Sequence, residues 1–388
     1  MLADCDLIRD NRRTGEPLVP RILRVRSATP SIDTVYVRPA RGQNLRTWTD
    51  NTEALADALG AHRVAITRTR PGVLALVIER RQPFGEVIPA PDIPADAAEV
   101  DLGALDVGDT EHATPLLVSV AGGAHRLVAG ATGRGKGSLI FAPLRALGPA
   151  IPAGLVRVWM IDLKGGAETE RAAPLFHRRA ITMPDALALL AEVRDELRRR
   201  QDLMRETKTR RCAVSTDTPV ELVMIDELAM LTAYGDRTQV REALRLLAEI
   251  LTQGRAAGIC VWGYIQEPSK DVLDVRELFT TRMCLGVTAA SHVDMVLGEG
   301  ARERGALADE IPADPEHAGI GYLIEPHNRL PIRFRAAYVT DHEIDELVDR
   351  CAIRPPRGSG GGDGEVIDLH PRNDRDSDGN DGDEDGAA

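Results

Sequence analysis

The sequence predicts an α/β protein built on a mostly parallel β-sheet, and two observations support this fold class. From residue 115 onward, short apolar stretches alternate with longer amphipathic ones, which is the pattern of successive βαβ units. Several of the apolar stretches also end in glycine or in polar side chains. We expect strands at residues 125–129, 156–162, 221–226, 258–266 and 281–287, with helices at 184–206 and 238–253.

A small α+β domain is predicted ahead of this sheet. Strands are expected at residues 21–26, 34–38, 63–67 and 73–79, and a helix begins after Asp50 and ends at Gly60. A proline-rich stretch at 89–94 follows and indicates an extended linker. The predicted organisation is an extension at 1–19, the α+β domain at 20–85, the linker and lead-in at 86–114, the α/β domain at 115–354, and a tail at 355–388.

The tail carries much of the negative charge of the chain. The 388 residues have a net charge of −12, of which −7 belongs to residues 355–388, so the first 354 residues carry only −5. The tail is rich in Gly, Asp, Asn and Ser and has too few apolar residues to fold, so we expect a disordered, solvated segment. The acidic total therefore does not exclude a nucleic-acid partner.

Composition excludes several other classes of protein. No run of 18 apolar residues occurs, so no membrane-spanning helix is expected, and the polar N-terminus does not resemble a secretory signal. Five cysteines without CxxC spacing argue against zinc binding or a disulfide framework and fit a reducing cytoplasm. Aromatic residues make up only 3%, which disfavours a base-stacking platform for single strands.

A glycine-rich loop after the first α/β strand predicts a phosphate-binding site. Glycines let backbone N–H groups surround phosphates, and the helix that follows adds its N-terminal dipole. Lys136 is one of only four lysines beside 44 arginines, and we expect it to reach the β- and γ-phosphates. Gly137 replaces the expected Ser or Thr, so either Ser138 reaches the metal or water completes its coordination shell. The expected nucleotide-binding residues are Gly130, Ala131, Thr132, Gly133, Arg134, Gly135, Lys136, Gly137 and Ser138.

Two adjacent carboxylates end the apolar strand at 221–226. Asp226 is expected beside Mg²⁺, and Glu227 is expected to polarise the attacking water. The alternative is an acid pair that only stabilises the N-terminus of the next helix. With a phosphate loop in the same domain, we favour the hydrolytic interpretation.

Polar residues also end two other predicted strands. Gln266 is positioned to contact the γ-phosphate or the water, although it could instead cap its own loop before Pro268. Lys164 lies in a glycine-rich turn after residue 162, and its role as structural or functional stays open. An arginine-rich run at 194–205 could face DNA, but a solvated helix face paired with Glu192, Asp195 and Glu196 is favoured.

These motifs, in this order, resemble the FtsK/SpoIIIE family of DNA-translocating ATPases, and in particular plasmid-transfer proteins of mycelial actinobacteria. The segments that carry the resemblance are GATGRGKGS, IDLKGG, RDELRRRQDLM, VMIDELAML, GRAAGICVWGYIQEPS and LFTTRMCLGV, within residues 115–324. The resemblance implies a RecA-like P-loop NTPase core that binds ATP and Mg²⁺ and forms a hexameric ring around double-stranded DNA. It also implies catalytic roles for Lys136, Glu227 and Gln266, a metal role for Asp226 and Ser138, and an arginine supplied by the neighbouring subunit, for which Arg255 and Arg282 are the candidates.

The chain departs from the family in ways that affect the prediction. Family members commonly carry membrane helices and a winged-helix module, and neither is evident here, so attachment to the inner face of the membrane would need a partner protein. A cytoplasmic location is expected. Two alternatives stay open: an ATPase of the same superfamily that drives protein secretion, and a slow nucleotide switch that acts as an interaction protein.

Overall fold

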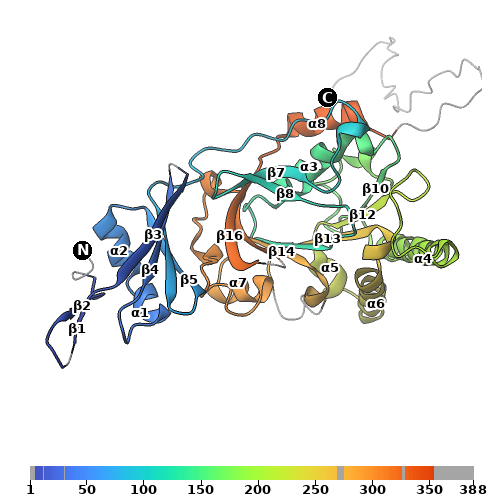
Figure 1. Cartoon of the computed structure of the whole chain (residues 1–388). Coiled ribbons are helices and arrows are strands. Elements are labelled where there is room, and N and C mark those ends of the chain that lie inside the picture. The colour runs from blue at the N-terminus through green and yellow to red at the C-terminus, as the bar shows by residue number, and fades with distance from the viewer. Residues whose placement is uncertain (1–4, 12, 30, 269–274, 326–327, 354–388) are drawn as a thin grey trace, which may run out of the picture. The chain divides into compact units, whose positions relative to one another are not determined.

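A ten-stranded sheet forms the centre of the computed structural model, which describes residues 5–11, 13–29, 31–268, 275–325 and 328–353 (Figure 1). The predicted tail at 355–388 lies outside the described residues. Six strands are parallel and run in the order β11 (Arg178–Ala180), β10 (Val156–Ile161), β12 (Val220–Ile225), β13 (Ile259–Ile265), β9 (Arg126–Ala129) and β14 (Thr281–Leu285). Every α/β strand predicted from the sequence is confirmed.

Four antiparallel strands extend this sheet, and the sequence analysis did not predict them as strands. They follow β14 in the order β15 (Ile320–Glu325), β16 (Asn328–Ala336), β7 (Leu105–Thr110) and β8 (Pro115–Val118). Strand β7 lies upstream of residue 115, so the sheet includes part of the segment expected as a lead-in. The parallel half and the antiparallel half are therefore built from chain segments on both sides of the phosphate loop.

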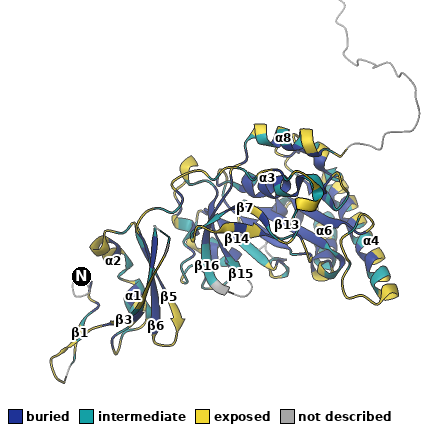
Figure 2. Cartoon of the chain, turned by 45° about the horizontal axis from the view of Figure 1, so that its top comes forward, coloured by how far each residue is buried: buried dark blue, intermediate teal, exposed yellow. Residues whose placement is uncertain are grey.

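Helices cover both faces of the large sheet. One face packs against α4 (Met183–Thr207), α5 (Leu228–Thr232), α6 (Arg237–Gln253) and α7 (Ala290–Leu297), and the other against α3 (Lys136–Leu147) and α8 (Asp341–Cys351) (Figure 1). Alternate residues of β12 enter the two cores: Val223 and Ile225 face the first, Leu222 and Met224 the second. Because both faces are covered, β12 and β13 are buried along their whole length, as the dark blue of β13 shows in Figure 2.

Short 3₁₀ helices connect these elements: η1 (Ala97–Glu99), η2 (Gly148–Ala150), η3 (Ala173–Leu175), η4 (Arg255–Ala257), η5 (Arg276–Leu278), η6 (Ala308–Glu310) and η7 (Pro315–His317). The proline-rich stretch at 89–94 has no helix or strand, as expected. Among the described residues, no helix is both long enough and apolar enough to cross a membrane.

The N-terminal domain is a four-stranded antiparallel sheet with helices on one face. Its strand order is β3 (Arg21–Thr29), β4 (Ile32–Arg38), β6 (Val73–Glu79) and β5 (Arg63–Arg70), and its helices are α1 (Leu45–Thr49) and α2 (Thr52–Leu59). Trp48 and Leu55 are fully buried between helices and sheet. The four predicted strands and the second helix are confirmed, whereas α1 and the small hairpin of β1 (Arg9–Asp10) and β2 (Pro17–Leu18) were not predicted.

The arginine-rich run on α4 is mostly a surface of ion pairs, with one exception. Arg198 pairs with Glu249 and Arg199 with Glu196, as a solvated helix face requires. Arg200, however, is fully buried and donates to the carbonyls of Pro219 and Ala257 and to the carboxylate of Glu221. Arg200 does pair with Glu196, but the interpretation as a solvated face is wrong for it, because the helix turns this side chain inward toward the amino end of β12.

Candidate nucleotide-binding site

The predicted phosphate loop leaves the carboxyl end of β9 and turns directly into α3. Gly133 and Gly135 adopt φ values of 75° and 89°, which L-residues with side chains rarely adopt. Gly135 also approaches the backbone of Gly319 so closely that a Cβ atom would lie 2.5 Å from the Gly319 nitrogen. Helix α3 begins at Lys136, so its first N–H groups border the loop, as anion binding requires.

Lys136 extends its ammonium group back over the loop. Its Nζ donates to the carbonyl oxygens of Gly130 at 2.7 Å and Ala131 at 3.4 Å. Burial lowers the pKa of Lys136 to about 8, while the carboxylate of Glu227 acts in the opposite direction. The ammonium group therefore stands between the loop and the acidic residues, where it could neutralise a bound phosphate.

Gly137, Ser138 and Arg134 differ in the space and the contacts around their side-chain positions. No atom lies within 4 Å of the place that a Cβ of Gly137 would occupy, so a serine side chain would meet no obstacle there. Ser138, the next residue, is only 9% exposed. Arg134 turns away from the loop, since its guanidinium donates to the carbonyl oxygens of Ile311 and Pro312. The structure thus gives the Arg134 side chain a packing role, although its backbone remains part of the loop.

The two predicted carboxylates lie next to a lysine. Lys164 Nζ is 3.6 Å from Asp226 Oδ2 and 3.1 Å from Glu227 Oε2, and its side chain is 28% exposed. Asp226 is almost fully buried, and this burial raises its pKa to about 6, against the attraction of Lys164. The same carboxylates raise the pKa of Lys164 against the effect of its own partial burial. Lys164, whose role the sequence left open, therefore lies beside the two predicted site carboxylates.

Gln266 connects the acidic residues to the phosphate loop. Its backbone N–H donates to both carboxylate oxygens of Glu227, at 3.3 and 3.2 Å. Its side-chain Oε1 accepts from the hydroxyl of Thr132 at 3.5 Å. The alternative that Gln266 only caps its own loop does not describe these contacts, because both of its partners belong to other loops.

The two candidate arginines lie at the opposite edge of the sheet. Arg255 begins η4, just before β13, and Arg282 is the second residue of β14, so both are at the amino ends of parallel strands. Arg282 pairs with Glu277 at 3.0 Å and donates to the carbonyl of Phe279. Arg255 is exposed and has no side-chain partner among the described residues. Neither arginine joins the cluster of its own chain.

The donor set is compatible with Mg²⁺ although it is small. Asp226 Oδ2 is buried and accepts no hydrogen bond within the described residues, which leaves an oxygen available to a cation. No group of three or more His, Cys, Asp or Glu side chains suited to a metal occurs in that part of the chain. Mg²⁺ in nucleotide sites typically uses one or two carboxylates together with substrate phosphates and water. Asp226 is therefore suited to hold Mg²⁺, together with the hydroxyl of Ser138, which lies two residues after Lys136 in the sequence.

The sheet order, the loop at the end of β9 and the acidic pair at the end of β12 define a P-loop ATPase of RecA-like architecture. Comparison with family models then identifies the parts of the chain. Residues 98–241 match the FtsK/SpoIIIE family, and residues 3–80 match the N-terminal domain of actinomycete conjugal transfer proteins. The chain accordingly contains an FtsK/SpoIIIE-family domain and, ahead of it, a conjugal-transfer N-terminal domain.

Curated relatives agree with this assignment. A DNA translocase FtsK of Pseudomonas syringae pv. tomato is 25% identical over 368 residues, covering 84% of this chain and 44% of the relative. A DNA translocase FtsK of Oceanobacillus iheyensis is 28% identical over 248 residues, covering 58% of this chain and 30% of the relative. The chain thus spans less than half the length of these relatives.

Solved structures share the fold. The conjugation coupling protein TcpA of pCW3, in a monomer form with ATPγS, aligns with a TM-score of 0.59 at 18% identity, over 85% of this chain and 93% of that chain. The cytoplasmic domain of the type VII secretion ATPase EccC of Thermomonospora curvata aligns with a TM-score of 0.52 at 21% identity, over 75% of this chain and 35% of that chain.

Proposed function

We propose that the chain is an ATP-driven motor that moves double-stranded DNA during transfer of a conjugative plasmid or an integrative element. The observation that carries this proposal is the combination, in one chain, of an FtsK/SpoIIIE domain with a conjugal-transfer N-terminal domain. Relatives named as DNA translocases and a structural neighbour named as a conjugation coupling protein support it. The motor is proposed to work as a hexameric ring in the cytoplasm, held at the membrane by a partner protein.

The residues at the carboxyl edge of the sheet support the proposed chemistry. The loop N–H groups and Lys136 would bind the β- and γ-phosphates of ATP. Glu227, fixed by the N–H of Gln266 and by Lys164, would accept the proton of the attacking water. Asp226 and Ser138 would hold Mg²⁺, which when bound neutralises charge on the phosphates. Gln266, which contacts both Glu227 and Thr132, is suited to sense the γ-phosphate.

We propose that a neighbouring subunit supplies an arginine that the site lacks among the described residues of its own chain. Among the described residues, no arginine lies within hydrogen-bond distance of Asp226 or Glu227, and the cation that pairs with both carboxylates is Lys164. Arg255 is exposed at the other edge of the sheet and is free to enter the site of a neighbouring subunit. In a ring, the carboxyl ends of the parallel strands of one subunit would hold the nucleotide, and Arg255 at the amino ends of the strands of the next subunit would complete that site.

ATP hydrolysis measured against duplex length and salt tests this function. We expect duplex DNA to stimulate hydrolysis at least about tenfold, and expect the stimulation to fall steeply between 50 and 200 mM salt, because phosphate contacts release counterions. Single-stranded DNA should stimulate less. Lys136→Ala, which removes the phosphate-binding ammonium group, is the control for contaminating ATPase and should neither bind nor hydrolyse ATP.

The outcome that contradicts the proposal is clear. If duplex DNA leaves the rate of hydrolysis unchanged at low salt, the chain is not a DNA motor, and the secretion ATPase or nucleotide-switch alternatives replace it. Stimulation by a secreted polypeptide would then favour the first of these.

A further inference from the structure

The arginines of the N-terminal domain are mostly without partners. Residues 1–80 contain thirteen arginines and nine acidic residues, a net charge of +4 in a chain whose total is −12. Within the described residues, Arg46, Arg63 and Arg80 form ion pairs with carboxylates. The others in this domain have neither an ion pair nor a side-chain hydrogen bond to any described residue: Arg9, Arg13, Arg21, Arg24, Arg26, Arg38, Arg41, Arg68 and Arg70.

Strand register gathers some of these free arginines on one face of the four-stranded sheet. Arg21 lies opposite Arg38, and Arg24 lies opposite Tyr36 in the β3–β4 pair. Residues opposite each other in an antiparallel pair share a face, and residues alternate between faces along a strand. Val37, between Tyr36 and Arg38, is buried against α1 and α2. The arginines therefore project from the face that the helices do not cover.

Two more arginines join the same face. Arg26 lies opposite Thr34, which shares its side of β4 with Tyr36. Arg70 lies opposite Val73 on β6, and Val73 is on the same side as Ala75, the partner of Tyr36. All five arginine residues are exposed. We call this surface the basic sheet face, and it consists of Arg21, Arg24, Arg26, Arg38 and Arg70.

Among the described residues of the four strands, no free carboxylate shares this face. Glu79 is the acidic residue that register places on this side of the sheet, but it is only 1% exposed and already pairs with Arg63 and Arg333. Asp33 lies opposite Ile78, on the helix side, and pairs with Arg80. The basic sheet face thus presents five positive charges that the described residues do not neutralise.

The spacing and chemistry of this face fit a phosphate backbone. Alternate residues on a strand are about 7 Å apart and neighbouring strands about 5 Å apart, so the guanidinium groups form a two-dimensional array of donors. Arginine binds phosphate oxygens through paired N–H groups. Tyr36 is the sole aromatic residue that register places among them, so stacking of single-stranded bases is not favoured.

A lipid surface is a poorer match. Membrane-binding faces combine basic residues with large apolar ones on the same side. The exposed apolar residues of β3 are Ile22 and Val25, at 59% and 58% exposed, and they lie opposite Val37 and Val35 on the helix side. The basic and apolar side chains of β3 therefore point in opposite directions.

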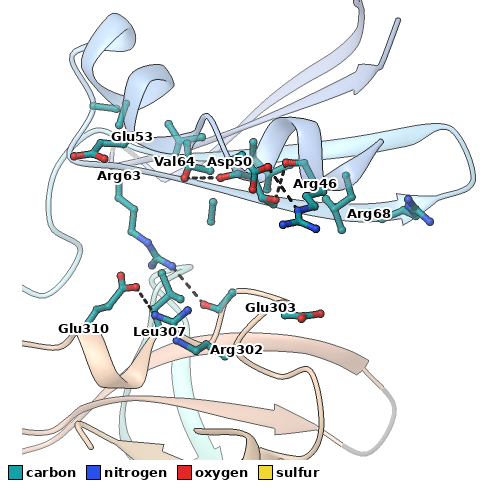
Figure 3. Close-up of a pocket in the computed structure, with 18 of the residues that line it drawn as sticks. Arg46, Asp50, Glu53, Arg63, Val64, Arg68, Arg302, Glu303, Leu307 and Glu310 are labelled. Carbon is teal, nitrogen blue, oxygen red and sulfur yellow. Dashed lines mark hydrogen bonds and ion pairs between the residues drawn. The ribbon is translucent and has the colours of Figure 1, made fainter. Parts of the chain in front are cut away.

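A cleft elsewhere in the molecule provides a contrast. This cleft has a volume of about 1230 Å³ and is lined by residues of α1, α2 and β5 and by residues between 302 and 310. Figure 3 shows the side chains that line it. Three of its four arginines pair with carboxylates: Arg46 with Asp50, Arg63 with Glu79, and Arg302 with Glu310. The charges of the cleft are largely satisfied internally, whereas those of the basic sheet face are not.

We propose that the basic sheet face of the N-terminal domain binds the phosphate backbone of double-stranded DNA, as a contact separate from the motor domain. The inference rests on the proposed function in one respect, since we take the duplex DNA that the proposed motor moves as the polyanion that binds this face. The contact would be independent of base sequence, because arginine-to-phosphate bonds do not distinguish bases. It would hold the duplex while the motor hydrolyses ATP.

The test compares two full-length variants with the parent chain. In the first, Arg21, Arg24, Arg26 and Arg38 are all changed to Gln. In the matched control, four exposed arginines of the motor domain with no partner among the described residues are changed to Gln: Arg210, Arg211, Arg237 and Arg241. Affinity for a fluorescent 30-base-pair duplex is measured by anisotropy at several salt concentrations.

We expect the first variant to bind the duplex at least about tenfold more weakly at low salt, with a salt slope reduced by about one for each lost contact. The control variant should bind within about threefold of the parent. Replacing the same four residues by Lys should restore most of the affinity, which separates lost charge from altered folding. Basal ATP hydrolysis without DNA should be unchanged in all variants.

Different failures have different signatures. If the first variant binds the duplex with the affinity and salt slope of the parent, the inference is wrong, whatever the motor does. If it instead loses binding to vesicles of phosphatidylcholine with phosphatidylserine while duplex binding persists, the face is a lipid site and the inference is overturned. If duplex binding depends on these arginines but DNA does not stimulate hydrolysis, the proposed motor function fails and the DNA-binding face stands.

Discussion

At the carboxyl edge of the parallel strands, opposite charges from separate loops meet, whereas at the amino edge Arg255 is exposed without a partner in the described chain. The carboxyl edge holds Lys136, Lys164, Asp226 and Glu227 within one cluster. A parallel sheet brings all carboxyl ends to one edge, so such a cluster needs only one polar residue after each strand. One edge thus gathers the groups that the proposed binding and hydrolysis of ATP require, whereas the other presents an arginine that we propose acts on a neighbouring subunit.

The largest expected effect concerns the carboxylate at the centre of the cluster. Glu227→Gln keeps the shape of the side chain and removes its ability to accept a proton, so turnover should fall by about 10²- to 10⁴-fold while ATP affinity is retained. Steady-state hydrolysis and equilibrium binding of a fluorescent ATP analogue measure the two. Glu168→Gln, a change at an exposed carboxylate nearby, should alter turnover less than about threefold. Undiminished turnover in Glu227→Gln would remove this residue as the base.

A smaller but still large effect is expected at the amino edge. Arg255→Ala should lower turnover of the assembled protein about 100-fold or more, as loss of an arginine supplied in trans does, and leave ATP binding intact. Arg282→Ala should have a much weaker effect, because Glu277 and the carbonyl of Phe279 already occupy its guanidinium.

Mixing subunits shows on which side Arg255 acts. Chains carrying Arg255→Ala and chains carrying Glu227→Gln are each inactive, yet a mixed assembly contains sites with an intact Glu227 beside a neighbour with an intact Arg255. We expect mixing to restore measurable hydrolysis. No recovery, in an assembly shown to be mixed, would place Arg255 outside the neighbouring site.

Lys164 should contribute a moderate effect through the position of Glu227. Its ammonium group and the N–H of Gln266 hold the Glu227 carboxylate, and removing one of these restraints should lower turnover about tenfold with less than threefold change in KM for ATP. Lys164→Met makes this change, and Lys164→Arg, which keeps the charge, should recover part of the activity. Equal losses in the two variants, or a change confined to KM, would contradict a positioning role.

The smallest expected effect is on the free energy of unfolding, and it comes from a residue at the amino ends of the parallel strands. His125 is fully buried before β9, its Nδ1 accepts from the Val261 N–H at 3.0 Å, and its Nε2 has no partner among the described residues. Burial, with a contribution from the charge of Arg255, lowers its pKa to about 4. Below pH 6.5, His125 therefore takes up a proton in the unfolded chain but stays mostly neutral in the folded chain down to about pH 4. The free energy of unfolding consequently falls as the pH drops from 6.5 toward 4.

The size of this effect can be measured with one variant. Between pH 7 and pH 5, His125 should account for about 2 kcal/mol of the lost free energy of unfolding. Urea unfolding at the two pH values measures the loss, and His125→Asn, which keeps an acceptor but does not titrate, should reduce it by that amount. An identical pH dependence in the variant would show that His125 titrates normally.

The sequence was sufficient for five of the six parallel strands, because these strands are largely buried and appear as mainly apolar runs that the glycine-rich loop and the acidic pair follow directly. The edge strand β11 was not predicted, since it is three residues long and two of its residues are arginines. The antiparallel half was missed because the side chains that it buries include arginines. In β16, Arg335 is 3% exposed and donates to the carbonyls of Phe84, Glu86 and Glu316, while Arg333 pairs with Glu79.

The contacts of individual polar side chains also could not be predicted from the sequence. Lys164 was noticed because lysine is rare here, yet its partners are 62 and 63 residues away in the chain, and only the β10–β12 pairing brings them together. Arg134 was assigned to the nucleotide with the rest of its loop. Nothing in the motif indicates that its side chain is held by the carbonyls of residues 311 and 312.

The close approach of Gly135 to Gly319 has a consequence for how this loop can vary. A methyl group at position 135 would overlap the backbone of residue 319, and both glycines have positive φ, whereas position 137 is open and has no such constraint. A library randomised across the loop and selected for DNA transfer should therefore keep glycine at 135 in nearly every survivor and accept several small residues at 137. The glycine that departs from the usual motif is the one that selection could most easily replace.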